Sequence, residues 1–305
     1  MTIESNLERV LQAGKFAVTG ELGPPRGADV EVIKKKAQLL KGHVDAVNVT
    51  DNQTAIVRMS SVAACALLSQ LGLDPVLQMV CRDRNRIALQ SDLFGAYALG
   101  IRNVLCLTGD HQKFGDHPTA KNVFDLDSIQ LIQTVKRLRD EKKMLGGSDV
   151  QGEFKMLIGA AENPFGDPFK FRVTRLAKKV AAGVQFLQTQ CIFNLPKFKE
   201  WMKMVCDRGL HEKVAIFGGV TPIKSAGMAK YMKNSVAGMD VPDEIIKRVA
   251  GVPKGKASEE GVKIAVETIQ QLKETPGVRG IHMMAIEWEE MVPKILQQAG
   301  LSPRP

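Results

Sequence analysis

The sequence predicts a single α/β domain over residues 1–305, folded as a (β/α)8, or TIM, barrel. Short apolar runs typical of buried strands alternate with helical segments eight times. No linker rich in Pro, Ser or Gly interrupts this alternation, and 44% hydrophobic residues are ample for one large core. A doubly wound open sheet is the runner-up. The lack of a Gly-rich dinucleotide fingerprint after any strand counts against it.

The first strand is expected within Phe16–Pro25, FAVTGELGPP. Apolar residues alternate there with small or polar ones, which is the period of a strand. The breaker Gly23–Pro25 ends the run directly after one carboxylate, Glu21. The sequence therefore predicts a lone acid at the end of a strand, flanked by apolar residues and glycine.

The first half of the chain then alternates regularly. In 29–41, apolar residues recur at helical spacing and the lysines fall opposite them, which is typical of a surface helix. The runs VDAVNVTD, PVLQMV and NVLCL predict strands because β-branched and apolar residues fill them. The expected order is strand 44–51, helix 60–71, strand 75–80, helix 85–99, strand 103–107 and helix 126–141.

The second half keeps the same rhythm. In 258–274, five apolar residues share one helical face, and GIHMMAI then supplies a last apolar strand. The expected order is strand 155–160, helix 168–182, strand 184–190, helix 197–209, strand 214–217, helices 225–235, 242–249 and 258–274, strand 280–286 and helix 288–299.

Composition excludes several classes of protein. The formal charge is +9, but the basic residues are dispersed and aromatic residues make up only 5%, so we expect no nucleic-acid partner. An anionic ligand or an acidic protein partner suits the charge better. No apolar run of 18 residues and no signal-peptide core occur, so we expect a cytoplasmic protein without a membrane span.

The cysteines and histidines predict no metal site. The 5 cysteines are odd in number and never spaced as CxxC, which argues against disulfides, an iron–sulfur cluster or a zinc knuckle. We expect them to be reduced and mostly packed. No HExxH motif or Cys/His cluster is present, so metal-dependent hydrolysis is not expected.

Polar residues end most of the predicted strands. In a (β/α)8 barrel the active site lies at these carboxyl ends. Each residue taken alone is typical of a turn or a helix cap. Together, a few acids among neutral amides and hydroxyls suit a planar cofactor held by hydrogen bonds beside one sequestered general acid. The residues are Glu21, Thr50, Asp51, Asn52, Gln78, Thr108, Gly109, Asp110, Glu162, Asn163, Gln190, Thr221 and Glu287.

In combination these motifs resemble the methylenetetrahydrofolate reductase family, flavin-dependent (β/α)8 enzymes of one-carbon metabolism, from Phe16 onward. FAVTGELGPP is similar to the family's first strand and VNVTDN to its second. QMVC is similar to its His-Leu-Thr-Cys motif and LTGD to its Leu-Arg-Gly-Asp motif. The stretch KKVAAGVQFLQTQCIF resembles the family's Lys-Val-Asp-Ala-Gly leading into Thr-Gln-Phe-Phe. The chain looks like the short form found in acetogen-type bacteria.

The resemblance implies an oxidoreductase that passes a hydride from reduced flavin N5 to the methylene carbon of 5,10-methylenetetrahydrofolate, giving 5-methyltetrahydrofolate. It implies that Glu21 is the general acid toward N10, that Asp110 stabilises the 5-iminium cation, and that Gln190 binds folate together with both acids. The flavin-contacting positions that it implies are Thr50, Gln78, Thr108, Gly109, Asp110, Ala161, Glu162 and Lys179.

Departures from the family pattern concern the cofactor and the electron donor. Thr108 stands where an Arg is common, Gln78 where a His is common, and Met232 where an aromatic residue stacks on ligand. These differences leave FMN as the alternative to FAD. They favour an iron–sulfur and zinc companion subunit as donor over direct binding of NAD(P)H. We also expect an oligomer.

Two other functions are weighed against this one. A phosphate-binding TIM-barrel lyase or aldolase would need a glycine-rich cradle after the last two strands, of which Gly218-Gly219 is a faint sign, and a lysine on a strand. A non-catalytic subunit would hold no chromophore. A yellow purified protein therefore distinguishes the reductase from both alternatives.

Overall fold

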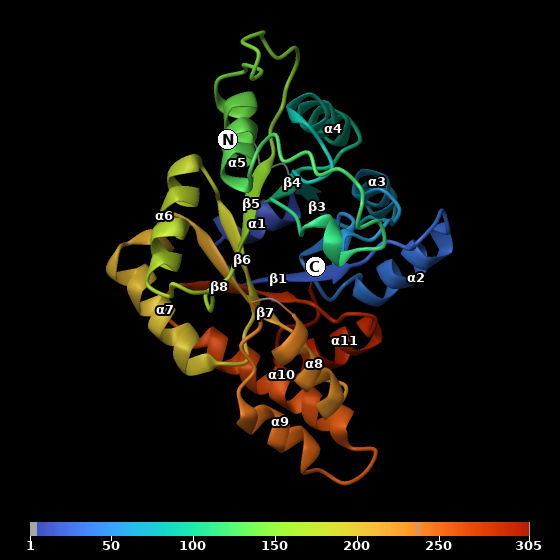
Figure 1. Cartoon of the computed structure of the whole chain (residues 1–305), viewed down its shortest axis with the longest axis vertical. Helices are drawn as coiled ribbons and strands as arrows, with labels where there is room; N and C mark the ends of the chain where they lie inside the picture. Colours follow the sequence, from blue (N-terminus) through green and yellow to red (C-terminus); the bar gives the residue numbers. More distant parts are fainter. Residues whose placement is uncertain (1–4, 237, 305) are drawn as a thin grey trace.

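The computed structural model describes residues 5–236 and 238–304, which form a closed barrel of parallel strands (Figure 1). β1 pairs with β2 on one edge and with β8 on the other, so the sheet has no free edge. The predicted (β/α)8 fold is therefore confirmed, and the open sheet is not formed. The strands are β1 Ala17–Leu22, β2 Ala46–Val49, β3 Pro75–Val80, β4 Asn103–Leu107, β5 Leu157–Glu162, β6 Phe186–Cys191, β7 Ala215–Val220 and β8 Val278–Met283.

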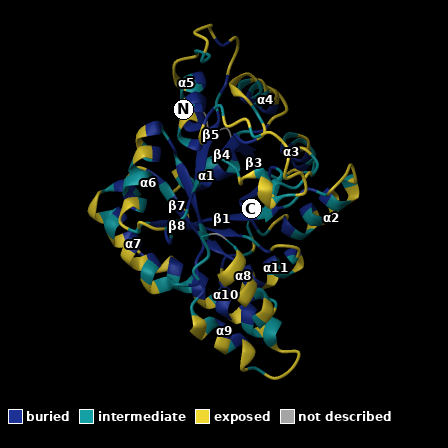
Figure 2. Cartoon of the chain, in the orientation of Figure 1, coloured by how far each residue is buried: buried dark blue, intermediate teal, exposed yellow. Residues whose placement is uncertain are grey.

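Helices surround the barrel, and Figure 2 shows that the strands are buried while the outer helix faces are exposed. α10 packs against β7 and β8, and α9 packs against α8 and α10, which extends one end of the molecule (Figure 1). The helices are α1 Asn6–Gln12, α2 Val30–Leu40, α3 Ser61–Gln70, α4 Arg86–Ala98, α5 Ser128–Asp140, α6 Phe171–Ala182, α7 Leu195–Asp207, α8 Ala226–Ser235, α9 Asp243–Ala250, α10 Ala257–Lys273 and α11 Val292–Gln298.

Side-chain caps fix the starts of several helices and so the ends of the loops that precede them. Asp127 accepts a hydrogen bond from the backbone N–H of Gln130, whose side chain accepts one from Asp127 in return. This reciprocal cap satisfies two N–H groups that α5 cannot pair internally. At the starts of α2, α4, α7 and α8, the side chains of Asp29, Asn85, Asn194 and Ser225 accept hydrogen bonds from backbone N–H groups of the first turn.

The predicted strand ends hold for β3 and β4, differ by one or two residues for β2, β5 and β6, and differ by three residues for β7 and β8. β8 ends at Met283, three residues before the predicted end at Ile286. After one more hydrogen bond to β7 from the Met284 N–H, the chain leaves the ladder and turns at Glu287, whose φ is 50°. The apolar run continues past the strand because Ala285 is buried in the core. Glu287 therefore does not end a strand, which corrects that expectation.

The amino-terminal half of the barrel interior is filled by apolar side chains. Phe186 and Phe217 stack with ring centroids 5.8 Å apart. Gly159 makes room for them, because a Cβ there would lie 2.1 Å from the Phe186 ring. Leu7 and Val10 of α1 join the same cluster and close this end. The only open end for a ligand within the described barrel interior is thus the carboxyl end of the strands.

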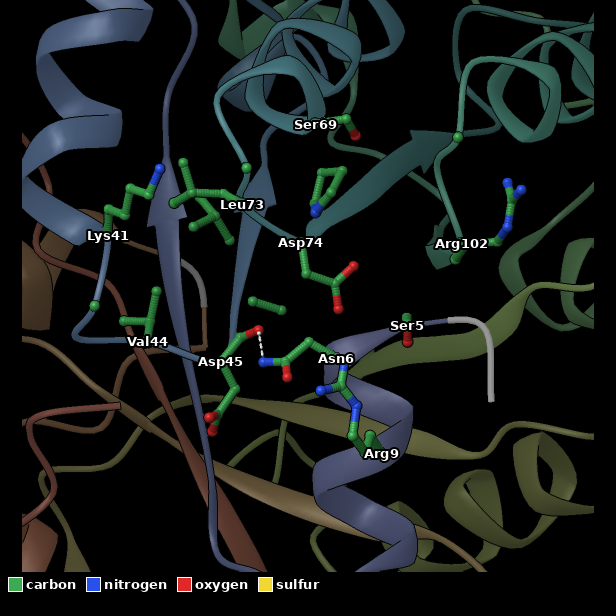
Figure 3. A pocket seen from close by; sticks show the side chains of 16 residues that line it. Ser5, Asn6, Arg9, Lys41, Val44, Asp45, Ser69, Leu73, Asp74 and Arg102 are labelled. Carbon is green, nitrogen blue, oxygen red and sulfur yellow. Dashed lines mark hydrogen bonds between the residues drawn. The ribbon is translucent and has the colours of Figure 1, made fainter. Parts of the chain in front are cut away.

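Asp74 connects α1 to the closed end of the barrel. It accepts hydrogen bonds from the Leu7 N–H and from Asn103 Nδ2, each at 2.8 Å. Figure 3 shows its carboxylate directed toward Ser5 and Asn6 in a hollow of about 570 Å³. Burial raises the pKa of Asp74 from 3.8 to about 6, although these two hydrogen bonds oppose the shift.

We predict that Asp74 makes the protein more stable as the pH falls from 7 to 5. Its pKa is higher in the folded chain than in the unfolded chain, so folding takes up a proton as the pH drops through about 6. Relative to Asp74→Asn, the free energy of unfolding of the wild type should rise by about 1 kcal/mol over this range. Urea titrations at several pH values measure the difference. Equal pH slopes in the two proteins would contradict the prediction.

Candidate functional site

The floor of the barrel mouth is a layer of buried polar side chains joined by hydrogen bonds. Gln188 on β6 donates from Nε2 to Thr19 Oγ1 and to Asn48 Oδ1, each at 3.0 Å. Asn48 Nδ2 donates back to Gln188 Oε1 at 2.7 Å. His282 on β8 completes the layer, with Nδ1 2.9 Å from Thr19 Oγ1. Because all four side chains are buried, these mutual bonds offset the loss of their hydrogen bonds to water.

Glu21 stands one layer above this floor, two residues after Thr19 and on the same face of β1. Its Oε2 is 3.4 Å from Gln78 Nε2 and 3.4 Å from His282 Nε2. The side chain of Glu21 is 19% exposed and that of His282 is 4% exposed, so the carboxyl group can meet a ligand. The sequence predicted apolar surroundings for this acid, whereas the structure places an amide and an imidazole beside it.

The tautomer of His282 decides which of its ring nitrogens carries the hydrogen and what the ring offers to Glu21. If Thr19 donates its hydroxyl proton to the Ile281 carbonyl, 3.4 Å away, then His282 Nδ1–H donates to Thr19. His282 Nε2 is then an acceptor for the acid proton of Glu21. If Thr19 donates to Nδ1 instead, Nε2 carries the hydrogen and faces Glu21 Oε2 at 3.4 Å. The direction of the Thr19 hydroxyl therefore decides whether Nε2 faces Glu21 as an acceptor or as an N–H group.

Thr50, at the carboxyl end of β2, brings an unpaired hydroxyl to the same end of the barrel. The residue is 3% exposed, and its Oγ1 has no hydrogen-bond partner in the described part of the chain. That oxygen lies 3.8 Å from the point where a Cβ on Gly23 would stand, so it neighbours the loop after β1. An unpaired buried hydroxyl costs about 1–3 kcal/mol, so this group is suited to pair with a bound molecule.

A hydrogen bond and a close packing contact hold the turn after β4 in place. Thr108 Oγ1 accepts a hydrogen bond from the Ser128 N–H at 3.2 Å, where α5 begins. Gly109 has φ 95°, and a Cβ there would lie 3.1 Å from the Cβ of Arg82. Only glycine suits both this conformation and this close approach. The turn presents the exposed Asp110 at the rim of the mouth.

Arg82, directly beyond β3, joins three successive loops at the mouth. The residue is 3% exposed, and its guanidinium donates to the carbonyls of Asn52 at 3.2 Å and Asp110 at 3.0 Å. It also forms a 2.7 Å ion pair with Asp83. The position of the Asp110 backbone is therefore set by a side chain from the neighbouring strand end.

Gln190 and Ala161 lie at the ends of β6 and β5. The register between β6 and β7 shifts between Gln188 and Cys191, so the strand is irregular at Gln190. Gln190 is partly buried, and its Oε1 accepts a hydrogen bond from the Cys191 N–H at 3.0 Å. Ala161 shares the inward face of β5 with Gly159 and faces the mouth.

Glu162 and Lys179 form a buried ion pair outside the barrel wall. Glu162 follows Ala161 and points to the opposite face of β5, toward α6. Lys179 Nζ lies 2.8 Å from Glu162 Oε2, and the two side chains are 5% and 1% exposed. Lys179 also donates to the Ala161 carbonyl. Burial lowers the pKa of Lys179, and the Glu162 carboxylate opposes that shift. The Lys179 ammonium and the Glu162 carboxylate thus pair with each other.

Cysteines and methionines contribute packing in the described chain. All five cysteines are free, as expected, and burial raises the pKa of Cys191 to about 12, which makes it a poor nucleophile. Met232 packs in a buried cluster with Ile223 and Val249. In residues 5–236 and 238–304, no group of three His, Cys, Asp or Glu gathers in a way that could hold a metal. No helix in those ranges could cross a membrane.

Sequence reasoning missed five residues that shape this site: Thr19, Asn48, Gln188, His282 and Arg82. The first three each stand two positions before a residue predicted at the mouth, which is the period of a strand, so that signal was present. His282 is the one ionisable side chain within the run GIHMMAI. Arg82 lies in the charge-dense segment CRDRNR after β3, which gives no sign of the loops that it joins.

Comparison with protein families gives one match across almost the whole chain. A family model described as methylenetetrahydrofolate reductase matches residues 6–300. A Caenorhabditis elegans protein named "Probable methylenetetrahydrofolate reductase (NADPH)" is 22% identical over 314 positions, covering 98% of this chain and 44% of that protein. Methylenetetrahydrofolate reductase 1 of Schizosaccharomyces pombe is 25% identical, covering 75% of this chain and 36% of that protein. The chain thus spans less than half the length of these relatives.

Solved structures share the fold at low sequence identity. One is described as an uncharacterized protein from Clostridium thermocellum that binds two copies of 5-methyl-5,6,7,8-tetrahydrofolic acid. It is 12% identical, with a TM-score of 0.64 and 98% of each chain covered. An EDTA monooxygenase from Chelativorans sp. BNC1 is 10% identical, with a TM-score of 0.56 and 95% of each chain covered. These likenesses concern the fold alone.

We predict that Lys179→Met destabilises the protein by roughly 3–5 kcal/mol, because it leaves the Glu162 charge buried without a partner. Lys179→Met combined with Glu162→Gln should recover much of that loss. Urea unfolding of both variants measures the effect, and Lys178→Met, an exposed position on the same helix, is the control. If Lys179→Met keeps wild-type stability, the ion pair does not stabilise the fold.

Proposed function

The chain belongs to the methylenetetrahydrofolate reductase family, and from this premise we propose that it reduces 5,10-methylenetetrahydrofolate to 5-methyltetrahydrofolate with a bound flavin. The observation that carries the proposal is the placement of Glu21 in the barrel mouth, 3.4 Å from both Gln78 and His282. The folate bound by the Clostridium thermocellum protein of the same fold supports the substrate class. The flavin, when bound, supplies the hydride that passes from its N5 to the methylene carbon.

Glu21 acts in this proposal as the general acid. Its O–H bond breaks as an N–H bond forms at N10 of the substrate, which opens the ring and leaves a 5-iminium cation. Gln78 Nε2 donates a hydrogen bond to the carboxylate that remains, and His282 Nε2 lies 3.4 Å from the same oxygen. Thr19 fixes the orientation of this imidazole through its contact with Nδ1.

Asp110 and Gln190 contribute to substrate binding in the same proposal. The exposed carboxylate of Asp110 stabilises the cation by electrostatic attraction, and Arg82 fixes the backbone that carries it. Gln190 offers an amide to the pterin from the irregular end of β6. The basic surface, with a net charge of +9, suits the polyanionic tail of the folate.

The residues at the mouth fit a flavin in part. The buried Thr50 hydroxyl lacks a partner in the described chain, and Gly109, with φ 95°, forms the turn at the end of β4. We propose that these two, with Gln78, Thr108, Asp110 and Ala161, hold the cofactor, as FAD or as FMN. Glu162 and Lys179 stay predicted flavin positions, but their mutual pairing behind β5 supports a structural role.

A lyase or aldolase has less support, because none of the eight strands contains a lysine that could form a Schiff base.

For the reductase, we propose that electrons arrive from an iron–sulfur and zinc companion subunit in preference to NAD(P)H. The burial of Met232 bears on this proposal, since it leaves no stacking surface for nicotinamide at that position. We also propose that the chain works as an oligomer.

We predict that Glu21→Gln keeps its flavin and fold but loses folate reduction by about 10²–10⁴-fold, because an amide cannot deliver the proton. The measurement is reoxidation of the reduced flavin by methylenetetrahydrofolate after rapid mixing. Reoxidation by an artificial acceptor should be unchanged, and Glu290→Gln, an exposed acid in the short 3-10 helix that follows β8, is the matched control. Folate reduction within a few-fold of wild type would show that Glu21 is not the acid.

We predict that NADH and NADPH reduce the flavin of the isolated chain slowly, because the donor is expected to be a partner protein. The test mixes the purified yellow protein with each nucleotide and follows the flavin band. Dithionite serves as the positive control for reduction. Prompt bleaching at micromolar nucleotide would rule out the need for a companion subunit, and a colourless protein would rule out the flavin itself.

A further inference from the structure

A small polar cavity that is lined in part by Glu21 lies between the loops after β1, β2 and β8. Its volume is about 30 Å³, and each water needs about 10–15 Å³ of such volume, so it has room for about two waters. We propose that this cavity holds water that returns a proton to Glu21 after each turnover, and that Gln53 and Arg58 position that water. The proposal rests on the proposed role of Glu21 as general acid. The lining residues are Glu21, Gly23, Lys36, Gln53, Arg58, Ala285, Ile286, Glu287 and Glu289.

Two buried polar atoms in the cavity lining lack a protein partner in the described chain. Gln53 Oε1 is an acceptor and Arg58 Nε carries a donor hydrogen, and neither atom is accessible to bulk solvent. Leaving either group unpaired costs about 1–3 kcal/mol or more. A water that donates to Gln53 Oε1 and accepts from Arg58 Nε–H satisfies both atoms at once.

The loops around the cavity hold these two groups in place. Arg58 Nη1 donates to the Pro24 carbonyl at 2.9 Å, and the Arg58 N–H donates to Asn52 Oδ1 at 3.0 Å. Gln53 Oε1 lies 3.3 Å from the point where a Cβ on Gly23 would stand. The absence of a side chain at Gly23 therefore keeps the space next to Gln53 open.

Charged side chains of both signs line the cavity. Lys36 Nζ forms a 2.6 Å ion pair with Glu289, and the side chains are 20% and 7% exposed. Glu287 and Glu289 offset the charges of Lys36 and Arg58, so the lining is not strongly positive. The cavity meets Glu21 from the loops, whereas His282 contacts the same carboxyl group from the floor layer.

The proposed proton transfer to Glu21 needs only one further reactant, which is an acid from the solvent. After Glu21 has given its proton to N10, an O–H bond of the cavity water breaks as a new O–H bond forms on the Glu21 carboxylate. A proton from hydronium or a buffer acid attaches to the same water oxygen and restores it. No electrons are transferred in this step.

The test separates the first turnover from later ones. Gln53→Leu fills the cavity with an apolar group, whereas Gln53→Ala leaves room for an additional water. In a single turnover from protonated enzyme, both variants should reoxidise reduced flavin with methylenetetrahydrofolate within about twofold of wild type. With excess reduced viologen as donor, Gln53→Leu should turn over about tenfold more slowly, and imidazolium buffer should restore the rate. Gln53→Ala, which keeps the space for water but loses the amide acceptor, should be slowed less than Gln53→Leu.

Gln112→Leu is the matched control, because Gln112 is another buried amide with an unpaired Oε1 on a mouth loop but does not line the cavity. Equal steady-state rates in Gln53→Leu and wild type would overturn the inference, as would equal losses in the first and later turnovers. Failure of the wild type itself to reduce folate would instead refute the proposed function. A high-resolution crystal structure then decides the hydration: an ordered water bonded to Gln53 Oε1 and Arg58 Nε supports the site, and a dry cavity refutes it.

Discussion

The hydrogen-bonded layer of Thr19, Asn48, Gln188 and His282 is the constraint on which the mouth depends. Amide, hydroxyl and imidazole groups inside a barrel must satisfy one another, because water cannot reach them there. Their mutual bonds tie β1, β2, β6 and β8 together across the lumen. The layer thereby fixes both the height and the direction of the one acid above it.

The strand period explains why this layer and the site occur together. Side chains two residues apart share a face, so on β1, β2 and β6 the floor residue is followed two positions later by a residue of the mouth. Below the floor the same faces carry apolar side chains that close the barrel at α1. The interior thus changes from apolar to polar along the strands. The Glu21 carboxyl group lies just above the buried polar layer, where the interior becomes accessible to solvent.

The order of strands and helices was predictable from sequence because local apolar periods determine it, and β3 and β4 match to the residue. The contact between Glu21 and His282 was not predictable from sequence. It joins the two ends of the chain and exists only because β8 pairs with β1. Glu162 and Lys179 show another limit. Spacing placed Glu162 at a strand end, but only the pleat of β5 tells which face its side chain takes.

Barrel loops are usually treated as separable parts that can be exchanged without disturbing their neighbours. The guanidinium of Arg82 makes that view wrong for three loops of this chain, since it bonds to the segments after β2, β3 and β4 together. Transplanting any one of them into a related scaffold would leave buried hydrogen-bonding groups without partners. In this protein the three loops therefore form one unit, which would have to be exchanged as a whole.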